Sequence, residues 1–229
     1  MSDPSPADQR ALPALSILDA ESVLIAGGKL EWVPVRRSLG VRAFGVNAYR
    51  AASAGDAVIE EHVESPGQEE LYLVVRGSAR FTVDGENLDA QTGMAVFVER
   101  PEASRSAQAL EAGTVVLALG GWTDRAYAPL PWEPIYMAQE EMRLGDWAGA
   151  ARTLEREAGE QLGSAYVQYR LAYCYARCGA EQDAIAAIVE AVEINPGMLD
   201  RAADEPAFES LRTRDDWPRS GSAAGTFDP

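Results

Sequence analysis

Between about residue 30 and residue 120, apolar residues occur in short runs rich in β-branched and aromatic side chains, and turns containing glycine separate them. This pattern is typical of β-strands, and no helical periodicity interrupts it. Asp84-Gly85 predicts a hairpin turn, because glycine accepts the positive φ angle that such turns require. The spacing of the runs indicates a sandwich or barrel of the jelly-roll kind. Strands are predicted at 30–35, 42–50, 57–64, 70–76, 79–83, 94–99, 104–109 and 114–119.

The pattern changes after Pro129. Over residues 132–195, apolar residues recur three and four positions apart, which predicts amphipathic helices. An internal repeat is visible here, because similar segments begin at Gly145 and Gly179 with an offset of 34 residues. In the second copy, Gly179 is expected to end one helix, and small Ala172 and Ala184 let two helices approach closely.

A 34-residue period of this kind resembles the tetratricopeptide repeat, a helix hairpin. The resemblance implies repeats at about 131–164 and 165–198, followed by a terminal cap. The chain therefore predicts a segregated α+β fold, with a β-barrel before an all-α helical region. The expected organisation is a partly disordered N-terminal extension at 1–24, the barrel at 25–125, the helical region at 126–217 and a disordered tail at 218–229.

Charge and composition limit the partners. The formal charge of −16 disfavours nucleic acid and anionic membranes, because both are polyanions that need a basic patch. No apolar run approaches the roughly 18 residues of a membrane-spanning helix. No signal peptide opens the chain, and Cys174 and Cys178 lie on a predicted helix, where they are interpreted as small core residues. These features together predict a cytoplasmic protein.

The densest group of ionisable residues is the segment 60–70, which contains His62, Glu64 and Glu70. Strand alternation predicts that Glu60, His62 and Glu64 share one face. By the same rule, Tyr72 lies on the face of Glu70.

The segment Gln68–Gly77 resembles the first conserved motif of the cupin family, in which a glutamate precedes a glycine at the spacing of Glu70 and Gly77. Gly55 lies near the position of the glycine that opens this motif, and Gly93 begins a stretch similar to the second motif. The resemblance implies a cupin barrel that binds a small molecule, and homodimers by analogy. Metal-dependent cupins bind a divalent ion through two histidines and a glutamate of the first motif and a histidine of the second.

The chain departs from this pattern at the metal ligands. His62 is the only histidine of the chain. Glu64 stands near the position of the second histidine of the first motif, and Ser104 and Arg105 stand where the second motif has its histidine. The usual three-histidine iron site is therefore absent, and oxygenase chemistry of that kind is not expected.

Three interpretations of the cluster remain open. In the first, His62, Glu64 and Glu70 hold one divalent ion (Mn²⁺, Zn²⁺ or Fe²⁺), since imidazole and carboxylate suit such ions. In the second, the same three residues are catalytic and transfer protons without a metal. In the third, the carboxylates pair with arginines and the cluster is structural. The predicted ligand-binding residues around the trio are Glu60, Tyr72, Arg76, Phe97 and Arg105.

The sequence leaves open whether the protein is an enzyme. A barrel that binds a small molecule, with or without a divalent metal, is one expected function. The alternative is a sensory or protein-interaction module, in which the helices contact a partner protein and the barrel is structural.

Overall fold

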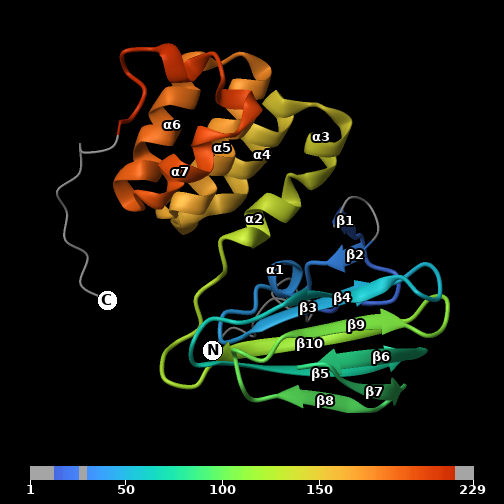
Figure 1. The fold of residues 1–229 in the computed structure, drawn as a ribbon. Coiled ribbons are helices and arrows are strands. Elements are labelled where there is room, and N and C mark those ends of the chain that lie inside the picture. Colours follow the sequence, from blue (N-terminus) through green and yellow to red (C-terminus); the bar gives the residue numbers. More distant parts are fainter. Residues whose placement is uncertain (1–12, 26–29, 220–229) are drawn as a thin grey trace, which may run out of the picture. The chain divides into compact units, whose positions relative to one another are not determined.

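The structure is a computed structural model that describes residues 13–25 and 30–219. The predicted disorder at 1–9 and after Arg219 falls outside the described residues. The chain divides into two compact units. Among the described residues, a sheet unit comprises 13–22 and 30–128, and a helical unit comprises 23–25 and 129–219 (Figure 1). The short strand β1 (Val23–Ile25) belongs to the helical unit.

The sheet unit contains two antiparallel sheets. The larger has the order β2 (Leu30–Val33), β3 (Gly45–Arg50), β10 (Val115–Trp122), β5 (Gln68–Arg76) and β8 (Ala95–Val98). The smaller has the order β4 (Ala57–His62), β9 (Arg105–Ala109), β6 (Ser78–Val83) and β7 (Glu86–Gln91). Helix α1 (Val35–Leu39) follows β2. Within the described residues no strand pairing joins the two sheets, so the unit consists of two separate sheets.

A buried apolar layer lies between these sheets. Tyr72 of β5 and Phe81 of β6 meet there, with ring centroids 5.6 Å apart. Successive side chains of a strand point to opposite faces, so alternate residues of each strand enter this layer. Val74, Val96, Val98 and Val116 contribute from the larger sheet, and Ile59, Ala79, Ala107 and Ala109 from the smaller one.

Eight of the observed strands match the eight predicted ones to within a few residues. The predicted turn at Asp84-Gly85 is confirmed, because both residues have positive φ, 48° and 84°. Strands β1 and β7 were not predicted. All residues of β7 except Ala90 are exposed, so it lacks the alternating apolar pattern that identifies a strand.

The helical unit contains α2 (Trp132–Met137), α3 (Gln139–Leu144), α4 (Trp147–Ala158), α5 (Ala165–Cys178), α6 (Glu181–Ile194) and α7 (Gly197–Ala203). Short 3-10 turns lie at Gly159–Gly163, Pro206–Phe208 and Leu211–Thr213. As expected, α5 ends before Gly179, whose φ of 81° is unfavourable for other residues. Ala172 and Ala184 are both fully buried where α5 packs on α6.

The two cysteines differ in environment. Cys174 is buried and Cys178 is exposed, so the interpretation of both as core residues is right only for Cys174. Among the described residues, no helix is long and apolar enough to span a bilayer.

Candidate functional site

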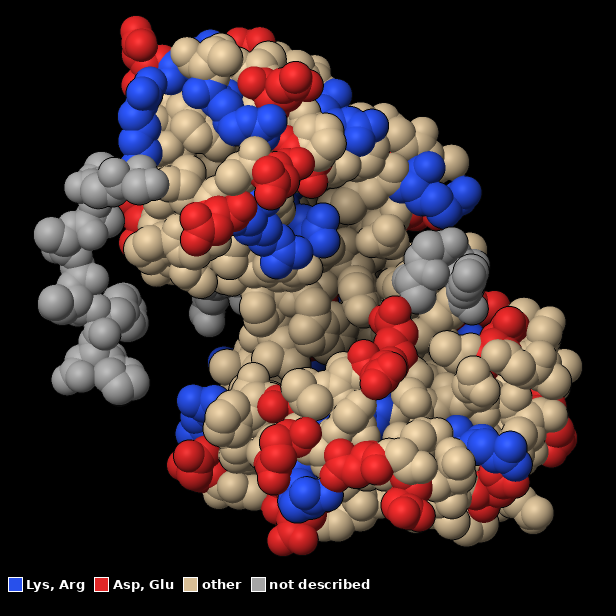
Figure 2. Space-filling model, viewed as in Figure 1, with Lys and Arg blue, Asp and Glu red and all other residues tan. Residues whose placement is uncertain are grey.

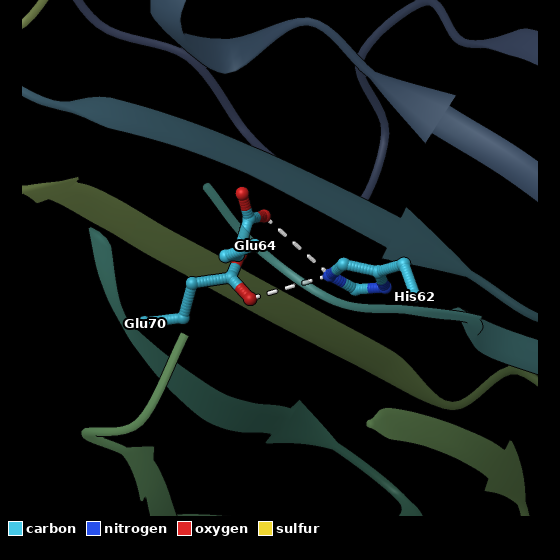
Figure 3. Close-up of side chains that lie close together, drawn as sticks. All are labelled: His62, Glu64 and Glu70. Atoms are coloured by element: carbon cyan, nitrogen blue, oxygen red, sulfur yellow. Dashed lines mark hydrogen bonds and ion pairs between the residues drawn. The ribbon is translucent and has the colours of Figure 1, made fainter. Parts of the chain in front are cut away.

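The ionisable cluster lies between the two sheets. His62 ends β4 and pairs with Arg105 of β9 in the smaller sheet, and Glu70 lies on β5 of the larger sheet. Glu64 follows β4, and its backbone N–H donates to the carbonyl of Pro101. Figure 3 shows the side chains of His62, Glu64 and Glu70 converging, with both carboxylates directed at one imidazole nitrogen.

One oxygen of Glu70 is the centre of the cluster. Its Oε2 lies 3.3 Å from Nε2 of His62 and 3.5 Å from Nη1 of Arg105, and it accepts a hydrogen bond from the hydroxyl of Tyr72. The side chains of Glu70 and Glu64 are 13% and 16% exposed, whereas that of His62 is 33% exposed. Glu70, Tyr72 and Arg105 therefore form the inner side of the cluster, and His62 forms its outer side.

Arg105 is the largest fully buried charged side chain among the described residues, with 1% of its surface exposed. Its Nη2 donates to the carbonyls of Arg100 and Pro101, at 2.7 and 3.1 Å. Its Nε is buried and has no hydrogen-bond partner within the described residues. A buried guanidinium requires a nearby negative charge, which Glu70 supplies. Arg105 thus places a fixed positive charge beside Glu70, on the inner side of the cluster.

His62 is held as a double donor. Nδ1 lies 2.8 Å from the backbone oxygen of Glu60, and Nε2 faces Glu70 at 3.3 Å and Glu64 at 3.6 Å. Desolvation by burial lowers the pKa of His62, but hydrogen bonds to Glu64, Glu70 and the Glu60 carbonyl outweigh it and raise the pKa to about 10. The imidazole is therefore positively charged at neutral pH.

The Tyr72 hydroxyl remains protonated and acts as a donor. Burial, together with the adjacent charge of Glu70, raises its pKa far above the ordinary value. Alternation along β5 explains the contact, because Glu70 and Tyr72 are two residues apart and point to the same face. The sequence placed Tyr72 there correctly but gave no sign of the hydrogen bond to Glu70.

Three of the predicted ligand-binding residues lie elsewhere. Phe97 is 56% exposed, because Val96 and Val98 occupy the inward positions of β8. Arg76 is exposed and donates to the carbonyl of Gly113 at 2.7 Å. Glu60 is exposed, and its backbone oxygen contacts His62.

The predicted common face of Glu60, His62 and Glu64 is therefore wrong. Regular alternation fails in this segment, since Val58 and Ile59 are both buried and the pairing of β4 with β9 is irregular between Ile59 and His62. The strand then ends at His62, and Glu64 reaches the cluster from the following loop.

A divalent ion would have to fit both the donor atoms and the charges of this cluster. One donor atom each of His62, Glu64 and Glu70 lie within 4.8 Å of one another, and their types suit Mn²⁺, Zn²⁺ or Fe²⁺. Without an ion, protonated His62 and Arg105 balance the charges of the two carboxylates. With an ion, His62 must lose its proton, and the cluster then carries one excess positive charge beside buried Arg105. The donor types therefore suit a divalent ion, whereas the charge balance counts against one.

No protein-family model matches the chain, and no curated protein matches it. Solved structures similar to it include KdgF from a Halomonas species, with 15% identity, a TM-score of 0.35 and coverage of 44% of this chain and 84% of that one. A sugar phosphate isomerase of the cupin superfamily from Silicibacter pomeroyi has 17% identity and a TM-score of 0.38, and the match covers 47% of this chain and 74% of that one. A cupin protein from Bacteroides fragilis has 22% identity and a TM-score of 0.35, and the match covers 43% of this chain and 82% of that one.

These TM-scores are all below 0.5. The strand order and the buried layer define the sheet unit, and the contacts of the clustered residues define the site.

Proposed function

We propose that the sheet unit is a cupin domain that binds a small polar organic molecule at the His62–Glu64–Glu70–Arg105 cluster without a divalent ion. One observation carries this proposal: Glu70 Oε2 is shared by His62 and Tyr72 and lies beside a buried guanidinium. Two positive side chains thus take the place of a metal in neutralising the carboxylates.

The outer side of the cluster defines the ligand. Protonated His62 offers an N–H donor, and Glu64 offers a carboxylate acceptor, 3.6 Å from Nε2. This pair matches a hydroxyl or a carbonyl group that carries a neighbouring hydroxyl, since such groups both accept and donate hydrogen bonds. If the bound molecule reacts, His62 is the proton donor to it, because the pKa of about 10 keeps the imidazole charged at neutral pH.

A thermal-shift screen of hydroxylated carbonyl compounds and polyols tests the proposal. A compound that raises Tm in the wild type should have no effect on Glu64→Gln or His62→Gln. Glu61→Gln is the matched control, because Glu61 is exposed and bonds the Ser104 hydroxyl rather than the cluster. Equal stabilisation of all four proteins would refute the assignment, as would retention of one divalent ion per chain after purification.

We further propose that the helical unit contains two tetratricopeptide-type hairpins, formed by α3 with α4 and by α5 with α6. Gly145 and Gly179 end the first helix of each pair, both with positive φ. Ala150 and Ala184, one repeat apart, are fully buried. Replacement of either alanine by leucine should destabilise the unit to a similar extent, since both positions lack room for a larger side chain. The homodimer and the cytoplasmic location remain predictions.

A further inference from the structure

One face of α5 carries tyrosine and arginine in alternation. Tyr166, Arg170, Tyr173 and Arg177 follow one another at intervals of four, three and four residues. Residues at these intervals lie on the same side of a helix. All four remain at least partly exposed, unlike Leu171 and its buried neighbours on the opposite side of the helix.

Each arginine of this face is stacked on an aromatic ring. The Arg170 guanidinium lies 5.5 Å from the ring of Tyr166, and that of Arg177 lies 5.8 Å from the ring of Tyr173. Arg170 also donates a hydrogen bond to the hydroxyl of Tyr166 at 3.3 Å, and Arg177 donates one to the hydroxyl of Tyr173 at 2.9 Å. Neighbouring helices extend the surface. Arg201 of α7 lies 5.2 Å from Tyr166, and Trp147 of α4 lies 4.3 Å from Arg177.

None of these three arginines forms an ion pair within the part of the chain that the structure describes. In the same unit, Arg143 and Arg214 each pair with carboxylates at 2.9 Å or less. The contrast is notable in a chain with 36 acidic and 20 basic residues. Acidic side chains are spread over the face seen in Figure 2, so carboxylates are abundant on the surface of this protein.

Stacking leaves these guanidiniums ready to bind an anion. A ring contacts the flat face of a guanidinium, whereas the N–H donors lie along its edge. Because the rings also restrict the side-chain rotamers, less conformational entropy is lost when a carboxylate binds.

We propose that this surface, defined by Trp147, Tyr166, Arg170, Tyr173, Arg177 and Arg201 and named the Tyr–Arg stripe, docks an acidic peptide segment of a partner protein. Charge complementarity selects the carboxylates, and the rings offer apolar contacts between them. Arg170 and Arg177 are seven residues apart on the helix, which corresponds to about 10.5 Å along its axis. In a polyproline II peptide, which has three residues per turn, carboxylates three residues apart lie on the same side and about 9 Å apart, close to this distance.

Nucleic acid also binds arginine and aromatic side chains, but it is the less suitable occupant. A polyanion with one charge per nucleotide would be repelled by a chain of net charge −16, whereas a short acidic peptide carries few charges.

Fluorescence anisotropy with the full chain tests the proposal. The probe is a labelled peptide with two glutamates three residues apart, and the same peptide with glutamines is its control. We expect binding of the glutamate peptide only, weakened by added salt. The double variant Arg170→Gln/Arg177→Gln should weaken binding about tenfold or more, equivalent to at least ~1.4 kcal/mol.

Arg152→Gln is the matched control variant. Arg152 is exposed on α4, in the same unit, and forms no ion pair within the described residues, so its loss should leave the affinity unchanged. A second variant, Arg170→Lys/Arg177→Lys, keeps the charge but lacks the two-pronged guanidinium, and should bind with intermediate affinity. Circular dichroism establishes that each variant is folded before binding is measured.

Three results would overturn the proposal. The first is no binding of the glutamate peptide, or equal binding of the glutamine peptide. The second is equal weakening by Arg152→Gln, which would indicate a general charge effect. The third is tight binding of a single-stranded oligonucleotide that depends on Arg170 and Arg177, which would identify the surface as a nucleic-acid site.

Discussion

Replacing Arg105 by methionine removes the buried positive charge and keeps most of the side-chain volume. The change breaks two hydrogen bonds to carbonyls, at 2.7 and 3.1 Å, and leaves Glu70 without its 3.5 Å neighbour. Because Arg105 is 1% exposed and Glu70 is 13% exposed, water does not replace these interactions. Breaking a buried ion pair by removing one partner costs about 3–5 kcal/mol. For a unit of about 100 residues, 3 kcal/mol lowers Tm by about 12 °C.

The assay is thermal unfolding at neutral pH, followed by calorimetry and far-ultraviolet circular dichroism. The double variant Arg105→Met/Glu70→Gln should be more stable than Arg105→Met alone. In the single variant the Glu70 carboxylate has lost the positive charge of Arg105, and the second substitution removes that carboxylate. Arg80→Met is the surface control in the same unit. The side chains of Arg80 and its partner Asp89 are each 50% exposed, so little change is expected. A Tm of Arg105→Met equal to that of Arg80→Met would refute the charge balance inferred for the cluster.

Three further predictions concern single residues. The imidazole nitrogen signals of His62, the only histidine, should report protonation up to a midpoint pH of about 10, and a midpoint near 6.5 would contradict the contacts with Glu64 and Glu70. Because the pKa is raised on folding, the stability that His62 contributes should be complete below pH 6.5 and lost as the pH rises towards 10. A thiol reagent should modify one cysteine rapidly, since burial raises the pKa of Cys174 to about 12, and rapid modification of both would contradict this. Gly77→Ala should destabilise the sheet unit, because the new Cβ would lie 2.5 Å from Oγ1 of Thr114.

Gly85→Ala is the control for that glycine substitution. Gly77 and Gly85 have similar positive φ angles, 76° and 84°, but nothing lies within 4 Å of a Cβ built at Gly85. Both variants therefore bear the cost of placing alanine at a positive φ angle. The free energy of unfolding of Gly77→Ala should be roughly 1–3 kcal/mol lower than that of Gly85→Ala, because only Gly77→Ala is also overpacked. Equal stability of the two variants in chemical denaturation would show that Thr114 moves aside at no cost.

Local signals of the sequence predicted much of the fold. Asp84-Gly85 and Gly179 identified a hairpin and a helix end, because glycine there meets a conformational need that few other residues meet. Strand β7 carries no such apolar signal and forms because its backbone pairs with β6. The segment 94–98 is apolar on both faces, so the pattern alone could not show that Phe97 points outward.

The site was predicted less completely, for two physical reasons. Alternation locates a side chain only while a strand is regular, and β4 becomes irregular before His62, which misplaced Glu60. The partner of Glu70 depends on which strands are neighbours. Arg105 is 35 residues from Glu70 in sequence, so only the arrangement of β5 and β9 in the fold reveals the contact.

The most direct test of the central claim is nuclear magnetic resonance of the His62 imidazole at neutral pH, with one equivalent of Zn²⁺ added to the purified protein. If His62 and Arg105 supply the positive charge of the cluster, the nitrogen signals remain those of a protonated ring and do not change on addition of zinc. Loss of the Nε2 proton, with a zinc-dependent shift of that nitrogen, would contradict the account and establish His62 as a metal ligand.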